Sequence, residues 1–293
     1  MIGITIDCRL GNQLFQYAFI RALSQQLNTP FFVNEAMMDF TAAGYFELDG
    51  YHPTANFWNK LFFKLRYGSP FKSLQSISLD HYREDEFAAL QDGRIYRGYF
   101  QSEIFFKNIL SAIPAYIKVK ERHAARFKKK YAQVFADGPV VAVHIRRGDY
   151  LDLNSWWEEN LGSSDLTLPV SYYRQCLGQI GDLGKYRVIF VSDDIEFVRL
   201  NFADVKNAIF AGDDLMMDFQ VLMNADICIV ANSSFAWWAA FLNPKTGKRV
   251  YCPRYWLGFK MCKEYPAHII PPAWIQVGVP TENTAYQAGG TGK

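Results

Sequence analysis

Residues 139–150 read PVVAVHIRRGDY, and this segment decides the fold expected for the chain. Its first half, Val140–Ile145, is a short run rich in β-branched side chains, a pattern typical of a buried strand in a parallel sheet. Arg146 and Arg147 follow the carboxyl end of that strand, where open α/β sheets bind their ligands. Because guanidinium groups suit bidentate contact with phosphate and stay charged, the segment predicts a site for a phosphate-bearing ligand.

Strand and helix patterns alternate on both sides of this segment. Near the amino end we expect a strand at 2–6, a turn at Leu10–Gln13, a helix at 14–27 and a strand at 31–33. In the second half we expect strands at 140–145, 187–192, 208–210, 227–230 and 249–252 and helices at 170–180, 195–202, 215–225 and 235–242. Strands that alternate with short helices predict the α/β class, with parallel sheets covered by helices.

The length of the chain favours two domains, since a domain averages about 150 residues and the chain has 293. Asp137-Gly138-Pro139 is the expected linker. This linker gives an amino-terminal domain at residues 1–137 and a carboxy-terminal domain at 138–280. Residues 281–293 are expected to form a disordered tail.

Two stretches of the first half are less regular. Residues 39–107 are aromatic and show no steady period, apart from an expected strand at 94–102. Residues 116–135 predict an amphipathic helix that carries the one dense basic run, 118–130. We interpret this run as a solvated helix face, with a peripheral membrane contact as the alternative.

Charge and cysteine content narrow the class of protein further. A net charge of +2 gives no global basic field, so no nucleic-acid partner is expected. The five cysteines are scattered without a C-x-x-C pair, which is typical of reduced thiols. Since no signal-peptide layout and no apolar stretch of roughly 18 residues is present, we expect a cytoplasmic protein, or one held peripherally at the inner face of the membrane.

Four loops of the second half place polar side chains at the carboxyl ends of expected strands: 144–150, 192–194, 211–214 and 231–234. Parallel strands bring these ends to one edge, so a shared pocket is expected. Asn232, Ser233 and Ser234 precede an expected helix, and they form either an anion site at its N-terminus or an ordinary N-cap. Two arginines at the same edge favour the anion site.

No motif for a metal or an organic cofactor is present in the sequence. Asp193-Asp194 and Asp213-Asp214 are not Asp-x-Asp pairs, and we interpret the second pair as helix caps. The five histidines lack metal-ligand spacing. The glycine-rich dinucleotide and phosphate-loop motifs and the serine elbow are missing as well. We therefore expect a site without metal or cofactor, in which fixed arginine neutralises a departing diphosphate.

Five motifs together resemble those of the α-1,2-fucosyltransferases of glycosyltransferase family eleven. They are Leu10–Ala18 (LGNQLFQYA), Gly98–Glu103 (GYFQSE), His144–Tyr150 (HIRRGDY), Phe190–Asp194 (FVSDD) and Asn232–Trp238 (NSSFAWW). The resemblance implies a GT-B architecture, in which two Rossmann-like domains face a cleft, with the donor on the second domain and the acceptor on the first. It also implies inverting, metal-independent transfer of L-fucose from GDP-β-L-fucose to the 2-hydroxyl of a terminal galactose in an oligosaccharide or a glycolipid-linked glycan.

The resemblance also implies roles for individual residues. The expected donor-binding residues are Gly11, Asn12, His144, Arg146, Arg147, Ser192, Asp193, Asp218, Asn232, Ser233, Ser234 and Phe235. Within this set, Arg146 would hold the β-phosphate, and His144 and Asp218 would read the guanine. The expected acceptor-binding residues are Arg9, Gln13, Tyr99 and Gln101, and the expected catalytic residues are Arg146, Asp149 and Asn12. Cys8-Arg9 stands where the family usually has Gly-Gly, so Arg9 is expected to face the cleft.

Two questions stay open at this point. The base that accepts the galactose proton could be Asp149, Asp7, Glu103 or Asp152, and Asp149 could instead be a buried partner that orients the arginines. The activity itself has two alternatives: a different GDP-sugar or fucosyl transferase with another acceptor linkage, or a non-catalytic glycan-binding protein.

Overall fold

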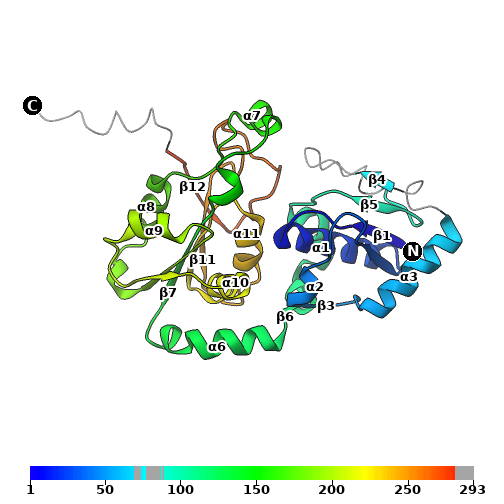
Figure 1. Cartoon of the computed structure of the whole chain (residues 1–293), viewed down its shortest axis with the longest axis horizontal. Coiled ribbons are helices and arrows are strands. Elements are labelled where there is room, and N and C mark those ends of the chain that lie inside the picture. Colours follow the sequence, from blue (N-terminus) through cyan, green and yellow to red (C-terminus); the bar gives the residue numbers. More distant parts are fainter. Residues whose placement is uncertain (69–73, 77–86, 88, 281–293) are drawn as a thin grey trace, which may run out of the picture. The chain divides into compact units, whose positions relative to one another are not determined.

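The computed structural model describes residues 1–68, 74–76, 87 and 89–280 and divides the chain into two compact units (Figure 1). Among the described residues, the first unit comprises Met1–Ala125 and Pro266–Ile269, and the second comprises Arg126–Tyr265 and residues 270–280. Each unit is built on a sheet of parallel strands, which confirms the predicted α/β class. The tail predicted at 281–293 lies outside the described residues.

A four-stranded parallel sheet with the order β2-β1-β5-β4 forms the first unit. Its strands are β1 (Ile2–Thr5), β2 (Phe31–Asn34), β4 (Leu74–Ser76) and β5 (Ile95–Arg97). The other elements up to residue 119 are α1 (Leu10–Gln26), α2 (Ala42–Tyr45), β3 (Phe46–Leu48), α3 (Pro53–Tyr67), η2 (Glu103–Ala112), α5 (Ile113–Tyr116) and β6 (Ile117–Val119). The predicted strand at 94–102 is shorter in the structure, because Phe100 has a φ of 52° and Ser102 caps η2.

Helix α1 begins at Leu10, so the predicted turn at Leu10–Gln13 is the first turn of the helix. The chain reverses one step earlier, where Cys8 has a φ of 61° and Arg9 is the N-cap. A positive φ is uncommon outside glycine, and the surrounding contacts must hold it in place.

The side chain of Gln13 supplies these contacts. It is fully buried, and its amide nitrogen donates to the carbonyl oxygens of Cys8 at 3.0 Å and Asp39 at 2.9 Å. Its amide oxygen accepts from the Thr41 hydroxyl and the Ala42 backbone N–H, both at 3.0 Å. The polar atoms of Gln13 are therefore used inside the first unit, and its contact with the acceptor stays a prediction.

Helix α3 lies in the region where the sequence predicted no regular element. Its start is marked by Pro53 in the first turn and by the His52 side chain, which accepts from the Thr54 backbone N–H. Only Asn56 and Phe63 are buried, so the helix has no broad apolar face toward the core.

The second unit contains a six-stranded parallel sheet with the order β12-β11-β10-β7-β8-β9. Its strands are β7 (Val140–Ile145), β8 (Arg187–Ser192), β9 (Ala208–Ala211), β10 (Ile227–Ile229), β11 (Arg249–Pro253) and β12 (Ile275–Val277). Its helices are α7 (Ser155–Leu161), α8 (Val170–Gly178), α9 (Ile195–Phe202), α10 (Leu215–Asn224) and α11 (Ser234–Phe241), with short turns η3 (Gly148–Tyr150) and η4 (Leu183–Lys185). The strands predicted at 140–145 and 187–192 are confirmed at both ends, whereas β12 and α7 were not predicted.

The order of these strands reverses direction next to β7. The chain adds β8 and β9 on one side of β7, and then β10, β11 and β12 on the other. Val141 accordingly lies between Val188 of β8 and Ile227 of β10. All six residues of β7 are buried, as expected for a central parallel strand.

The division between the units falls inside α6 (Glu121–Ala136), between Ala125 and Arg126, and not at the predicted linker 137–139. The helix also begins later than predicted, because β6 occupies Ile117–Val119 and pairs antiparallel with β3. Pro266–Ile269 rejoins the first unit, where the Ser102 hydroxyl donates to the His268 carbonyl at 2.7 Å.

Replacement of Gln13 by alanine is expected to lower the free energy of unfolding by about 2 to 4 kcal/mol, because buried groups lose their hydrogen-bond partners. Chemical denaturation measures this change. Gln25→Ala is the matched control, since Gln25 lies on the same helix and is exposed. Equal stabilities of the two variants would contradict the structural role of Gln13.

Candidate functional site

The carboxyl ends of β7 and β10 adjoin at the point where the strand order of the second unit reverses. In open α/β sheets, the loops on the two sides of such a point separate and leave a crevice for a ligand. The loop after β7 carries His144 through Tyr150, and the loop after β10 carries Asn232 and Ser233. The Tyr150 hydroxyl joins them by donating to the Asn232 carbonyl at 3.2 Å. Tyr150 belongs to the HIRRGDY motif, but its role in joining these loops was not predicted from the sequence.

The guanidinium of Arg146 is held between two carboxylates. Its Nη1 lies 2.8 Å from Asp193, which follows β8, and its Nη2 pairs with Asp149. The arginine side chain is 18% exposed, whereas that of Asp149 is 45% exposed. Asp149 is therefore a partner of Arg146, as one prediction allowed, but it is not a buried one.

Gly148 allows Asp193 to approach. A Cβ atom at this position would lie 2.5 Å from Asp193 Oδ2, the oxygen that pairs with Arg146. The glycine of the HIRRGDY motif is thus required by the carboxylate behind it and not by a positive φ.

The side chain of Arg147 contacts residues that follow β8 and stabilises the loop after β7. Its Nε donates to Asp194 at 3.1 Å, and its guanidinium carbon lies 3.5 Å from the centre of the Phe197 ring, so the cation stacks on that face. Its backbone N–H donates to Asp193 at 2.9 Å. Ser192 completes this turn by accepting from the Asp194 backbone N–H at 3.0 Å.

The N-terminus of α11 presents backbone N–H groups at the same edge. Ser233 is the N-cap residue, and its side chain makes no capping hydrogen bond among the described residues. The ordinary N-cap interpretation therefore does not account for this serine. Asn232 is fixed by donation from its amide to the Leu166 carbonyl at 3.0 Å, and Ser234 begins the helix. Such a terminus favours an anion by geometry and by its dipole.

His144 lies at the end of β7 and is neutral. Burial and the neighbouring charge of Arg146 lower its pKa to about 3. Its ring packs against that of Phe235, with centroids 5.7 Å apart. Its Nδ1 is enclosed and finds no hydrogen-bond partner within the described part of the chain.

Asp218 stands in the first turn of α10, where Asp214 is the N-cap and accepts from the backbone N–H groups of Met216 and Met217. The capping role predicted for Asp214 is thus confirmed. Burial, with the charges of Asp213 and Asp214, raises the pKa of Asp218 to about 7.

Three enclosed polar atoms at this edge have unused hydrogen-bonding capacity. They are His144 Nδ1, Asp218 Oδ1 and Asn232 Oδ1, none of which has a partner among the residues that the structure describes. A buried polar group without a partner costs about 1 to 3 kcal/mol, and a bound ligand, ion or water is a usual explanation for it.

The residues predicted in the first unit gather beyond the carboxyl ends of β1 and β5. The Gln101 amide donates to Asn12 Oδ1 at 2.7 Å, and the Cys8 thiol lies 3.4 Å from the Tyr99 hydroxyl. Gly11 is buried in the first turn of α1, and the backbone of Arg9 caps this helix. Asn12 and Gln101 are therefore in contact, and Tyr99 is held beside the residue that precedes Arg9, whereas the roles that the resemblance implies for them stay predictions.

The remaining candidates for the base differ in their surroundings. Asp7 pairs with Arg97 at 3.3 Å and accepts from the Cys8 backbone N–H at 2.8 Å. Partial burial raises the pKa of Glu103. Asp152 is exposed.

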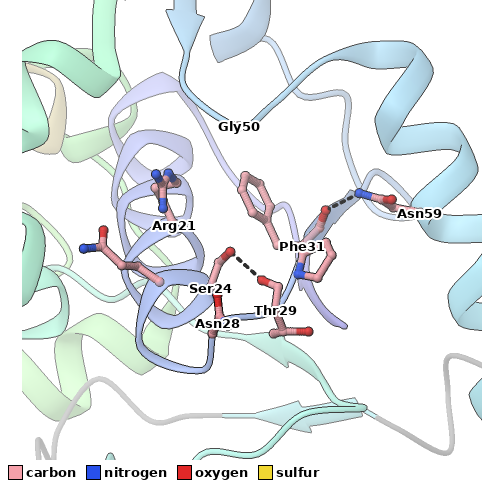
Figure 2. A pocket seen from close by; sticks show the side chains of 9 residues that line it. Arg21, Ser24, Asn28, Thr29, Phe31, Gly50 and Asn59 are labelled. Carbon is pink, nitrogen blue, oxygen red and sulfur yellow. Dashed lines mark hydrogen bonds between the residues drawn. The ribbon is translucent and has the colours of Figure 1, made fainter.

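Other kinds of site are not apparent in the described ranges. Within them, no group of three or more His, Cys, Asp or Glu side chains is placed to hold a metal ion, and no helix is long and apolar enough to cross a membrane. A hollow of about 450 Å³ opens beside Arg21 and Phe31 (Figure 2). This hollow lies at the amino end of β2, away from the strand ends that carry the predicted residues.

Comparison with known proteins identifies relatives over most of the chain. An alpha-1,2-colitosyltransferase from Escherichia coli is 26% identical over 298 residues, covering 92% of this chain and 96% of that protein. A galactoside alpha-(1,2)-fucosyltransferase 1 from Leontopithecus chrysomelas is 27% identical over 289 residues, covering 92% and 73%. The O-antigen biosynthesis glycosyltransferase WbnK from Escherichia coli is 30% identical over 122 residues, and this match spans only 39% of that protein.

The fold is similar to that of the fucosyltransferase NodZ from Bradyrhizobium. The TM-score is 0.52 at 15% identity, with 83% of this chain and 92% of that chain covered. A structure of NodZ alpha-1,6-fucosyltransferase soaked with GDP-fucose gives 0.51. This likeness and the two units with parallel sheets assign the chain to the GT-B fold class, as predicted. The family model described as Glycosyl transferase family 11 matches residues 74–274, more than half of the chain, so the chain belongs to this family and is a glycosyltransferase.

Proposed function

We propose that the chain transfers L-fucose from GDP-β-L-fucose to the 2-hydroxyl of a terminal galactose in a glycan, with inversion at the anomeric carbon and without a metal. The observation that carries this proposal is the placement of Arg146 at the reversal of the strand order. The loop that carries it is joined to the residues before α11 by the hydrogen bond from Tyr150 to Asn232, so a guanidinium and a row of backbone N–H groups lie at the same edge of the sheet. The family and the printed activities of the relatives support the choice of reaction.

Arg146 would act on the diphosphate as the bond to fucose breaks. Negative charge then grows on the leaving GDP, and a fixed cation that meets this charge stabilises the transition state without reorganisation. Asp193 holds one side of the guanidinium and is 27% exposed. Asp149 is the more exposed partner, and an exposed ion pair contributes only about 0 to 1 kcal/mol. A diphosphate oxygen can therefore replace Asp149 at Nη2 while Asp193 keeps the guanidinium in place.

Asp218 and His144 would recognise the guanine base. One edge of guanine presents two N–H donors side by side, and an ionised carboxylate can accept both. The pKa of Asp218 is about 7, so both of its forms are populated at neutral pH. Binding of this guanine edge would favour the charged form. His144 stays neutral and keeps Nδ1 available as an uncharged partner. This recognition explains why the protein retains polar groups that cost it stability.

The acceptor would contact Asn12, Tyr99 and Gln101 in the first unit, with Arg9 beside them. An inverting reaction needs a base that takes the proton of the galactose hydroxyl. The ion pair with Arg146 favours an orienting role for Asp149, and Asp7 is paired with Arg97 in the same way. Glu103, whose pKa is raised by burial, is therefore the stronger candidate in the first unit.

A related donor is the second candidate. The colitosyltransferase from Escherichia coli aligns over 96% of its length, so a different sugar on the same nucleotide is the specific alternative. Measurement of GDP release from a panel of GDP-linked sugars separates the two. A non-catalytic glycan-binding protein would show no thermal stabilisation by GDP and no GDP release.

The linkage of the product is the direct test of the proposed function. The protein is incubated with GDP-fucose and a panel of galactosides, with and without EDTA, and the products are examined by methylation analysis for the linkage and by proton NMR for the anomeric configuration. We expect fucose on the 2-position of terminal galactose, with the α-anomer formed and EDTA without effect. A product with another linkage, or loss of product with EDTA, would overturn the corresponding part of the proposal.

Replacement of Arg146 by alanine is expected to lower turnover by roughly a thousandfold, since one preorganised donor contributes about 3 to 4 kcal/mol. GDP release under saturating donor measures this effect. Arg187→Ala is the control, because Arg187 begins β8 at the opposite edge of the sheet. Near-normal turnover of Arg146→Ala would refute the role assigned to this arginine.

Asp149→Asn, in the same assay, distinguishes the two roles of this carboxylate. If Asp149 only orients Arg146, the substitution should lower turnover by less than about tenfold. If Asp149 is the general base, it should lower turnover by about a hundredfold or more.

Replacement of Asp218 by asparagine is expected to have opposite effects on binding and stability. In the wild type, the affinity for GDP should fall about tenfold for each pH unit below about 7, because the binding form is the ionised one. Calorimetric titration should show weaker binding by Asp218→Asn, with this dependence lost. Asp182→Asn, at an exposed aspartate, should keep the wild-type profile.

The folded state holds the Asp218 proton more tightly than the unfolded chain does. Its contribution to stability is therefore fully present at acidic pH and is lost as the pH rises from 3.8 to about 7. Above this range, Asp218→Asn should be more stable than the wild type by roughly 1 to 4 kcal/mol. A variant of lower stability that binds GDP normally would contradict both assignments.

A further inference from the structure

Helix α3 is attached to the first unit by a narrow strip of its surface. Asn56 replaces a neighbouring strand at the edge of the sheet: its amide donates to the Val33 carbonyl at 3.1 Å and accepts from the Val33 N–H at 2.6 Å. Asn59 adds a donation to the Phe31 carbonyl at 2.9 Å (Figure 2). Phe63 packs on Phe32, with ring centroids 5.0 Å apart. These contacts cover the edge strand β2, which is a usual way to protect an edge.

The rest of the helix exposes large apolar side chains. Phe57 is 62% exposed, Trp58 60%, Leu61 38%, Phe62 50% and Leu65 77%. The last four are spaced i, i+3, i+4 and i+7, so they form one continuous stripe. We call these five residues the outer face of α3. Within the described residues, Met1 borders a shallow hollow of about 450 Å³ with part of this face.

The charges on α3 are all of one sign. Lys60, Lys64 and Arg66 lie among the apolar residues, and Pro53–Tyr67 contains no aspartate or glutamate. Aromatic and leucine side chains combined with basic residues on a helix are typical of segments that lie in the interface of an anionic membrane. Pairing with a second copy of the same face would instead bring three positive charges against three.

We propose that the first unit docks on a membrane surface rich in anionic lipid through the outer face of α3. The apolar stripe would enter the boundary between headgroups and acyl chains, and the three basic side chains would contact lipid phosphates. The contacts to β2 leave the stripe unused, so the helix can dock without unfolding any part of the unit.

This placement differs from the membrane contact predicted at 118–130. Four basic side chains of that run are engaged within the protein: Lys120 with the Ala43 carbonyl, Arg122 with that of Gly44, Arg126 with Asp214 and Lys130 with Asp213. The aromatic side chains of α6 also pack on one another, as Phe127 does on Tyr131. The described residues of α6 form no exposed apolar stripe comparable to the outer face of α3.

Co-sedimentation with vesicles tests the proposal. The intact protein is mixed with vesicles of phosphatidylcholine alone or of equal parts phosphatidylcholine and phosphatidylglycerol, at low and high salt. We expect binding to the anionic vesicles, weakened by salt because exposed charges are screened. The triple variant Trp58→Ser, Phe62→Ser and Leu65→Ser should lose at least about tenfold in partitioning, and Lys60→Gln, Lys64→Gln and Arg66→Gln together a similar amount.

Two controls keep the result specific. Leu200→Ser removes another exposed leucine, which is 84% exposed in the second unit, and should bind as the wild type does. Turnover with a soluble acceptor should be unchanged in the α3 variants, which shows that they fold. Absence of wild-type binding, or equal binding by the triple variant, would overturn the proposal. So would a wild-type dimer in light scattering that the triple variant converts to a monomer, since the outer face would then bind a second copy.

Discussion

The pairing of β7 with β8 on one side and β10 on the other is the constraint on which the second unit depends. It makes β7 the strand from which the sheet grows in both directions, and it brings the loops after β7 and β10 to one place. This topology places the polar residues of HIRRGDY beside the loop that precedes α11. Without the reversal, other strands would separate β7 from β10, and Arg146 would lie farther along the same edge from the N-terminus of α11.

Closely spaced charged side chains gather at the carboxyl edge of the sheet in the second unit. Arg146 is held by Asp193 and Asp149, and the approach of Asp193 requires a glycine at position 148. Asp218 is buried near two other carboxylates and ionises only near neutral pH. The enclosed oxygen of Asp218 has no partner among the described residues, and the base of a bound nucleotide diphosphate would supply one.

The sequence predicted the second unit better than the first, for physical reasons. Strands such as Val140–Ile145 are buried on both faces, so their apolar runs are visible without any partner. Helix α3 was missed because asparagine amides attach it to the sheet, while its apolar side chains at helical spacing are exposed and do not mark a buried face. The role of Gln13 could not be read from residue type, since it depends on carbonyl groups distant in the chain. Likewise, the sequence showed Gly148 but not the carboxylate that requires it.

The position of β7 and β10 at the centre of the sheet has a dynamic consequence. Strands at the edges, β9 and β12, have one neighbour each and can open locally at small cost, whereas the central pair opens only when the sheet itself comes apart. The points at which the loops after β7 and β10 leave the sheet are thus held by its most protected strands. Opening that begins at β9 or β12 leaves the pairing of the strand before Arg146 intact until last.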